Sequence, residues 1–351
     1  MIKPFHTIKL NKPVDIYSGK GIVKEFVTIL KAKSESKNIV IVTDDNLIDI
    51  YGNNIEKFLI LHGYDTNIAI IKAGEKSKNI NTVSELYKFF HQTSIGRKDM
   101  IVALGGGVVG DITGFAAATY MRGIPYIQVP TTLLAMIDSS IGGKTGIDLP
   151  FGKNLAGAFY QPEAIVTDRI FLETLPEKTF NDGIAEAVKY GLISDAELFD
   201  LLLNGFDEKG LDDIIGRSIR IKSDIVEKDE KESGIRMILN FGHTFGHAIE
   251  KCMNYKDITH GAAIAAGMVI ASKIGEIKGV TPQGTTEKIT AALNKYNLPT
   301  STAIKKSELV KAIGADKKRN GNKINFVLLS EIGKAHTEKI SLKELGEIQY
   351  E

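Results

Sequence analysis

The first half of the chain alternates short apolar runs with amphipathic stretches. The runs are rich in β-branched residues and therefore predict strands, at residues 39–43, 66–71, 100–104, 124–129 and 164–167. Between them, apolar residues recur with helical spacing over residues 21–33, 47–62, 82–94 and 111–121. Nearly continuous apolar strands separated by helices indicate a parallel sheet buried on both faces, so we expect a doubly wound, Rossmann-like α/β domain.

The pattern changes near Pro176. Helical spacing dominates from there to residue 298, over residues 180–192, 196–203, 211–230, 244–252, 261–278 and 285–296. One strand-like run follows, at residues 324–329. A length of 351 residues also makes two domains the default. We therefore expect an α/β domain over residues 1–176 and a mostly helical domain over residues 177–351.

The overall composition is that of an ordinary globular protein, with 43% hydrophobic and 25% charged residues. A net charge of +1 gives no bulk attraction to nucleic acid or to a membrane surface. The single cysteine, Cys252, excludes an intrachain disulfide framework and fits a reducing compartment. No apolar run suits a signal peptide or a membrane span. These observations predict a cytoplasmic protein with neither a nucleic acid nor a membrane as partner.

Glycines and acids follow the predicted strands. The stretch GGGVVGD at 105–111 leaves one strand and opens a helix, where backbone N–H groups can approach a diphosphate; a tight turn with positive φ is the alternative. Asp44 comes after another strand and could bind a ribose diol or cap the next helix. Residues 74–79 form a polar loop, either a cofactor contact or a solvated turn.

Residues 130–148, PTTLLAMIDSSIGGKTGID, are the most unusual passage because they place polar and charged side chains among apolar residues and glycines. Charge in such surroundings is costly unless it is paired or functional. Lys144 and, just downstream, Lys153 could bind a phosphate or a carboxylate. Each lysine taken alone could equally be a solvated surface residue.

Two histidines stand four residues apart in residues 240–250, NFGHTFGHAIE. On a helix, His243 and His247 share one face, and imidazole is a common ligand of catalytic metals. The alternative is an ordinary helix. Gly242 and Gly246 are poor helix formers and indicate close approach of a ligand or another element. Two further candidate ligands are Glu186 and His260.

Small residues surround the pair formed by Glu186 and Lys189, which indicates burial; a surface ion pair is the alternative. Arg236 and Asn240 lead into the histidine stretch, and residues 316–318 read DKK. Many cationic and amide side chains beside a metal and nucleotide site suggest a small, polyanionic, hydroxylated substrate.

In this order and spacing, the motifs resemble the 3-dehydroquinate synthase family of sugar-phosphate cyclases over essentially the whole chain. The resemblance is carried by GGGVVGD at 105–111, PTTLLAMIDSSIGGKTGID at 130–148, GKN at 152–154, FLETLP at 171–176, AEAVKYG at 185–191, RMILNFGHTFGHAIE at 236–250, HG at 260–261 and DKK at 316–318.

The resemblance implies NAD in the first domain and a divalent metal, usually zinc and otherwise cobalt, between the domains. It implies that Glu186, His243 and His260 are the metal ligands and that His247 faces the substrate. This replaces the inference from spacing that His243 and His247 both bind the metal. It implies an NAD site lined by Asp44, Glu75, Lys78, Gly105, Gly106, Gly107, Asp111, Thr131, Thr132, Asp138, Lys144, Lys153, Phe171 and Thr174.

The resemblance also implies the substrate-binding groups Lys144, Asn154, Lys189, Lys222, Arg236, Asn240, His247 and one of Lys317 and Lys318. Arg122 would reach into the partner subunit's site, which implies a homodimer. The implied reaction is that of a lyase acting on 3-deoxy-D-arabino-heptulosonate 7-phosphate. NAD oxidises a ring hydroxyl, phosphate leaves by elimination, NADH returns the hydride, and ring opening with an intramolecular aldol step gives 3-dehydroquinate.

Two departures from the family pattern occur. Ala262 follows the His-Gly pair where the family commonly has Glu, and residues 185–189 read AEAVK in place of AEVIK. Neither removes a residue assigned to chemistry. Rival readings are a related sugar-phosphate cyclase, a metal-dependent polyol dehydrogenase and a non-catalytic nucleotide-binding module. Arg236 and the lysines fit a substrate carboxylate, which favours 3-dehydroquinate synthase over the related cyclase. A non-catalytic module leaves Glu186, His243 and His260 unexplained together.

Overall fold

The computed structural model describes residues 2–254, 256–317 and 323–350, with side chains for all of these except 315–317. The chain forms two compact units. The first is Met1–Leu175 with Lys222–Lys231, and the second is Pro176–Ile221 with Glu232–Glu351. The main division lies between Leu175 and Pro176. Residues 222–231, which include the end of helix α7 (Glu208–Lys228), group with the first unit instead of the second.

The first unit is built on a seven-stranded sheet with the order β1-β2-β9-β6-β5-β3-β4. Its neighbouring strands are parallel except for the pair β1–β2. This confirms the predicted doubly wound fold. The sequence did not predict β1 and β2, which lie at one edge of the sheet. The strands are β1 (His6–Ile8), β2 (Val14–Ser18), β3 (Asn38–Asp44), β4 (Asp65–Ile71), β5 (Met100–Gly105), β6 (Tyr126–Pro130) and β9 (Ala164–Thr167).

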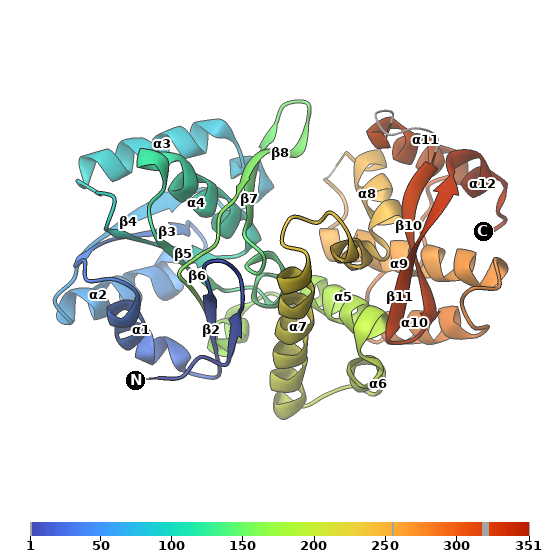
Figure 1. Cartoon of the computed structure of the whole chain (residues 1–351), viewed down its shortest axis with the longest axis horizontal. Coiled ribbons are helices and arrows are strands. Elements are labelled where there is room, and N and C mark those ends of the chain that lie inside the picture. Colours follow the sequence, from blue (N-terminus) through green and yellow to red (C-terminus); the bar gives the residue numbers. More distant parts are fainter. Residues whose placement is uncertain (1, 255, 318–322, 351) are drawn as a thin grey trace. The chain divides into compact units, whose positions relative to one another are not determined.

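Helices cover both faces of this sheet. Figure 1 shows α3 (Ile80–Gln92) and α4 (Gly107–Thr119) on one face, and α1 (Phe26–Lys33) and α2 (Asn53–Leu61) on the other. One core cluster joins strand residues to α3 and α4, and it includes Val40, Val42, Ile101, Ala103, Leu86, Phe90, Val109 and Ile112. Fully burying a Val, Leu, Ile or Phe side chain contributes roughly 1.5–3 kcal/mol, so this packing fixes the sheet and the loops at its edge.

The carboxyl ends of three neighbouring strands meet at one edge of the sheet. β3 ends at Asp44, β5 at Gly105 and β6 at Pro130. The N–H of Thr131 donates to the carbonyl of Gly105 over 3.0 Å, which holds two of these ends together. Ligands of doubly wound sheets bind at this edge, where the strand order reverses.

A separate antiparallel hairpin consists of β7 (Lys144–Leu149) and β8 (Gly152–Phe159). Gly146 lies opposite Gly157, and a Cβ on Gly157 would meet the carbonyl of Thr145 at 2.3 Å. β7 also packs closely on α4, since a Cβ on Gly114 would lie 2.4 Å from Thr145 Cγ2. Gly146, which belongs to the passage that suggested ligand binding, therefore also serves strand pairing.

The second unit is mostly helical, as predicted, with one added hairpin. Its helices are α5 (Glu177–Ser194), α6 (Ala196–Asn204), most of α7, α8 (His243–Cys252), α9 (His260–Ile277), α10 (Thr285–Asn294), α11 (Lys306–Lys317) and α12 (Leu342–Glu347). β10 (Lys323–Glu331) pairs antiparallel with β11 (Lys334–Ser341). Among the described residues, no helix is both long and apolar enough to cross a membrane.

Glycines bring three helices of this unit into backbone contact. A Cβ on Gly267 of α9 would lie 2.1 Å from the carbonyl of Gly242, which precedes α8, and a Cβ on Gly261 would lie 2.4 Å from Asp182 Cα on α5. Gly242 has φ +79°, a left-handed conformation that suits glycine. The predicted close approach at Gly242 and Gly246 is thus made by helix α9, and it positions the helices that carry Glu186, His243 and His260.

Candidate metal centre and nucleotide site

Three ligand atoms from three helices converge in the second unit. Nε2 of His243 and Nε2 of His260 each lie 3.6 Å from Oε1 of Glu186. Ligand atoms of the three residues lie within 4.8 Å of one another. A carboxylate with two imidazoles is a donor set that suits zinc with an open coordination position. The three residues therefore fit a divalent metal, and the family resemblance implies the same three as its ligands.

The pKa values of the two histidines are shifted in opposite directions. Glu186 is fully buried, and desolvation lowers the pKa of His243 well below its usual value despite the nearby Glu186 carboxylate. A neutral imidazole is the form that binds a metal. Desolvation also acts to lower the pKa of His260, but the carboxylates of Glu186 and Glu250 outweigh it and raise this pKa to about 10.

His247 belongs to a different grouping. Its ligand atoms gather with those of Glu250 and His260, not with Glu186. The ring centroids of His243 and His247 are 5.3 Å apart, and His247 is the more exposed of the two. The spacing argument that made both histidines ligands of one ion therefore receives no support from the donor groupings. Sequence reasoning missed Glu250, although its position three residues after His247 places it on the same helix face.

Two cationic side chains of this unit are buried. Lys189 contacts Glu186 one turn away on α5, and both are almost completely inaccessible to solvent, which confirms the burial predicted from their small neighbours. Arg236 is also buried, in the turn Ile235–Asn240 that leads into α8. Asn240 ends that turn and donates to Glu232 over 3.0 Å. The unit thus holds two buried cations close in sequence to the candidate ligands.

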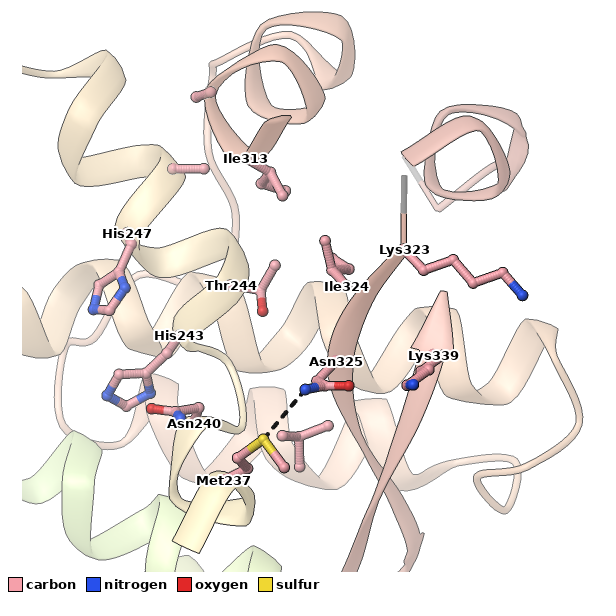
Figure 2. A pocket seen from close by; sticks show the side chains of 13 residues that line it. Met237, Asn240, His243, Thr244, His247, Ile313, Lys323, Ile324, Asn325 and Lys339 are labelled. Atoms are coloured by element: carbon pink, nitrogen blue, oxygen red, sulfur yellow. Dashed lines mark hydrogen bonds between the residues drawn. The ribbon is translucent and has the colours of Figure 1, made fainter. Parts of the chain in front are cut away.

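A cavity of about 610 Å³ opens beside α8. Asn240, His243 and His247 lie along one side of it, and Lys323 and Lys339 of the β10–β11 hairpin lie on the other (Figure 2). The two hairpin lysines had no distinguishing signal in the sequence, because exposed lysines are common on any surface. The candidate phosphate ligands Lys317 and Lys318 fall outside the described side chains.

The glycine turn of the first unit has a definite packing role. Gly106 precedes α4, which begins at Gly107, and its φ is −74°. None of Gly105, Gly106 and Gly107 has the positive φ of the tight-turn alternative. Instead, a Cβ on Gly106 would lie 3.1 Å from Thr132 Cγ2, and one on Gly107 would lie 3.0 Å from Ser139 Oγ. The glycines keep the helix N-terminus close to residues 131–139, an arrangement that suits a diphosphate.

Lys78 links several of the predicted site residues. Its Nζ donates to Asp111 Oδ2 over 2.5 Å and to Asn154 Oδ1 over 2.7 Å. Desolvation raises the pKa of Asp111, and the contact with Lys78 offsets this only in part. Asn154 has a left-handed backbone, φ +53°, and its N–H donates to Asp148. A predicted substrate residue and two predicted NAD residues therefore form one hydrogen-bonded group.

The other predicted residues of this unit differ in their contacts and in their exposure. Lys222 contacts Asp138, and Lys153 lies 3.3 Å from Glu75. Lys144 is exposed at the start of β7. Asp44 accepts hydrogen bonds from the N–H groups of Asn46 and Leu47, so it makes the capping contacts that were the alternative to ribose binding.

Phe171 and Thr174 meet a residue that sequence reasoning missed. Tyr51 packs edge-on against Phe171, and its hydroxyl lies 2.8 Å from Thr174 Oγ1. Tyr51 belongs to a short turn, Ile48–Gly52, shortly after β3. Nothing in the sequence pattern distinguished it from other tyrosines.

The doubly wound unit and the donor set of the helical unit together define a two-unit protein with a candidate divalent-metal centre. Residues 68–182 match the family model for the N-terminal part of 3-dehydroquinate synthase, and residues 183–319 match the model for its C-terminal part. The chain therefore belongs to the 3-dehydroquinate synthase family.

Individual relatives agree with this assignment. The 3-dehydroquinate synthase of Clostridium acetobutylicum is 49% identical over 94% of this chain and 94% of its own length. A 2-deoxy-scyllo-inosose synthase, solved with carbaglucose-6-phosphate, NAD+ and Co2+, is 26% identical with a TM-score of 0.88, covering 97% of this chain and 98% of its own. The 2-epi-5-epi-valiolone synthase of Streptomyces hygroscopicus, solved with NAD+ and Zn2+, is 26% identical with a TM-score of 0.86, covering 95% and 94%.

Proposed function

We propose that this chain converts 3-deoxy-D-arabino-heptulosonate 7-phosphate into 3-dehydroquinate and inorganic phosphate, a carbon–oxygen lyase reaction of aromatic amino-acid biosynthesis. The observation that carries the proposal is the convergence of Glu186, His243 and His260 in a chain that matches both halves of the family. The cyclase relatives solved with NAD+ and with Co2+ or Zn2+ support the same cofactors here.

In this proposal Glu186, His243 and His260 hold the divalent ion, zinc or cobalt. Their fit rests on the shared 3.6 Å approach of the two imidazoles to one carboxylate oxygen and on the neutral state that burial favours for His243. When bound, the ion polarises the hydroxyl and carbonyl oxygens of the substrate. The ammonium group of Lys189 contacts the buried carboxylate of Glu186 and offsets part of the cost of burying it.

NAD is assigned to the first unit, at the edge where β3, β5 and β6 end. Gly106 and Gly107 open α4 toward a diphosphate, and Lys78, held by Asp111, adds a fixed cation at the same loops. Asp44, Glu75, Thr131, Thr132, Asp138, Lys153, Phe171 and Thr174 complete the assignment. The bound nucleotide supplies the hydride acceptor and later the donor.

Substrate recognition is assigned to cations and amides in both units. Arg236 is buried and presents a planar guanidinium, which suits bidentate binding of the substrate carboxylate. Asn240 and His247 line the cavity beside α8 and can bind hydroxyl or phosphate oxygens. Lys144, Asn154, Lys189 and Lys222 are the remaining proposed contacts. Fixing one conformer of a flexible sugar phosphate is the main contribution of such a shell.

A homodimer is also part of the proposal. The β7–β8 hairpin projects from the helices of the first unit (Figure 1), and Phe151, Leu155 and Phe159 on it are 80%, 58% and 48% exposed. Met121 is 42% exposed, and both Met121 and Arg122 have positive φ, a costly backbone for such residues. Exposed apolar side chains and an arginine with a strained backbone suit contact with a second copy that receives Arg122.

The test is to incubate the purified, zinc-loaded protein and NAD with 3-deoxy-D-arabino-heptulosonate 7-phosphate while following phosphate, dehydroquinate and NADH. We expect phosphate and dehydroquinate to rise together with no net NADH, and chelation to abolish both. Turnover of a different heptulose phosphate or of glucose 6-phosphate instead would assign the chain to a sister cyclase. Net NADH from a simple polyol would overturn the proposal.

A further inference from the structure

The two ring nitrogens of His260 face two different carboxylates. Nε2 lies 3.6 Å from Oε1 of Glu186, and Nδ1 lies 3.6 Å from Oε1 of Glu250. Glu250 is buried on α8, whereas His260 begins α9. The imidazole is therefore flanked by one carboxylate of the candidate donor set and by a second carboxylate outside that set.

We propose that Glu250 is the positioning residue of the metal centre. Its carboxylate accepts a hydrogen bond from Nδ1–H of His260, so that Nε2, which gives up its proton when a metal binds, faces Glu186 and His243. This inference rests on the metal site of the proposed function and adds to it a residue that neither the donor set nor the family resemblance assigned.

The other histidine of the set has a matching arrangement. Nδ1 of His243 lies 3.2 Å from the carbonyl oxygen of Phe241, which leaves Nε2 facing Glu186. Metal-binding histidines generally donate their second ring N–H to a carbonyl or a carboxylate, and this partner sets ring orientation and ligand basicity. The structure supplies a backbone carbonyl for one histidine and Glu250 for the other.

The position of Glu250 also explains how two helices act together. It lies seven residues after His243, two turns along the same face of α8. One helix thus provides both a ligand and the group that orients the ligand of the neighbouring helix. The backbone contact at Gly242 and Gly267 holds these helices at a fixed separation, so a carboxylate at 250 stays within reach of His260.

A different arrangement would make Glu250 itself a ligand, because His247, Glu250 and His260 also bring ligand atoms within 4.8 Å. Glu186 and His243 are less exposed than His247, and two imidazoles approach the same oxygen of Glu186. These features favour the set that contains Glu186. The two arrangements differ in which substitutions abolish metal binding.

The experiment measures the zinc Kd of the full-length protein by competition with a chromophoric chelator, together with urea unfolding of the zinc-free protein. Glu250→Leu removes the acceptor while keeping a similar volume, and Glu250→Gln keeps a carbonyl acceptor without charge. We expect the zinc Kd to rise roughly 10- to 100-fold in Glu250→Leu and by less in Glu250→Gln. The variant Glu186→Gln should abolish tight binding, and His247→Gln should leave the Kd within about twofold.

The matched control is Glu276→Leu. Glu276 lies on the same helix as His260, and its carboxylate accepts the N–H of Thr286 over 2.8 Å, away from the three ligands. It should lower resistance to urea without changing the zinc Kd. Unchanged zinc affinity in both Glu250 variants would overturn the inference. It would also be overturned if His247→Gln weakened zinc binding as much as Glu186→Gln does. If the unaltered protein did not bind zinc, this result would instead contradict the metal site in the proposed function.

Discussion

The ammonium group of Lys189 contacts the carboxylate of Glu186, one turn away on helix α5, and neither side chain is accessible to solvent beyond 2%. A buried carboxylate needs an opposite charge nearby to remain ionised. The imidazoles of His243 and His260 also lie close to the carboxylate of Glu186. Lys189 and a bound metal would therefore compensate the same buried charge.

Replacing this lysine should destabilise the protein in a way that metal reverses. We expect Lys189→Met to lower the free energy of unfolding of the metal-free protein by about 3–5 kcal/mol, the usual cost of removing one partner of a buried ion pair. Excess zinc should then raise the melting temperature of the variant more than that of the unaltered protein. Calorimetry with zinc and with a chelator measures both effects. An equal zinc response in the two proteins would show that Lys189 and the metal do not share this charge.

The crossing of α8 and α9 should not tolerate a single added methyl group. A Cβ at Gly267 would lie 2.1 Å from the carbonyl of Gly242, so we expect Gly267→Ala to cost about 1–3 kcal/mol of stability and to weaken zinc binding. Gly346→Ala on α12 is the matched control, because a Cβ there meets nothing within 4 Å and should be neutral or slightly stabilising. Urea unfolding and zinc titration of the two variants measure the difference.

We expect substitution of Lys78 to weaken NAD binding and to leave zinc binding unchanged. Lys78→Met removes the cation that Asp111 holds at the proposed diphosphate site. A hydrogen bond to a charged group is worth about 1.5–3 kcal/mol, so loss of the contact with NAD should lower NAD affinity tenfold or more. Zinc affinity should remain unchanged, because the three ligands lie in the second unit. Lys72→Met is the control, since Lys72 is exposed and pairs with Asp45 over 2.9 Å. Isothermal titration with NAD distinguishes the variants, and equal losses in both would contradict the assignment of Lys78.

Arg122 can be tested by mixing two inactive proteins. If it acts in the partner subunit's site, Arg122→Ala and Glu186→Gln dimers should each be nearly inactive, yet regain activity when subunits exchange. Each mixed dimer then has one site with both groups, so random exchange should restore roughly a quarter of full activity. Mixing either variant with itself is the control. An inactive mixture, with subunit exchange verified by mass spectrometry, would place Arg122 in the site of its own subunit or remove its role.

The sequence predicted the central strands and most of the helices because their apolar periodicity is strong. It missed β7 and β8, whose pairing depends on Gly146 and Gly157, residues that carry no strand signal and invite interpretation as a ligand-binding turn. It also missed β11, a strand with mostly partly exposed side chains and charged residues. Strand pairing of this kind is decided by the partner strand and not by local propensity.

The candidate site was predictable in part. Spacing alone favoured His243 with His247, because helical periodicity shows which residues share a face but not which helices meet. The grouping of Glu186, His243 and His260 came from the family resemblance, and the structure brings those atoms together. Glu250 and Tyr51 stayed unnoticed, since their contacts depend on residues distant in sequence, as with Tyr51 and Thr174.

The backbone contact between α8 and α9 has a consequence for amide hydrogen exchange. The N–H of Gly246 donates to the carbonyl of Gly242 over 2.9 Å, and Gly267 lies against both groups. With no side chain between the helices, water cannot reach this amide by a local side-chain movement. Its hydrogen should therefore exchange only when the helix pair opens as a unit, among the slowest in the helical unit.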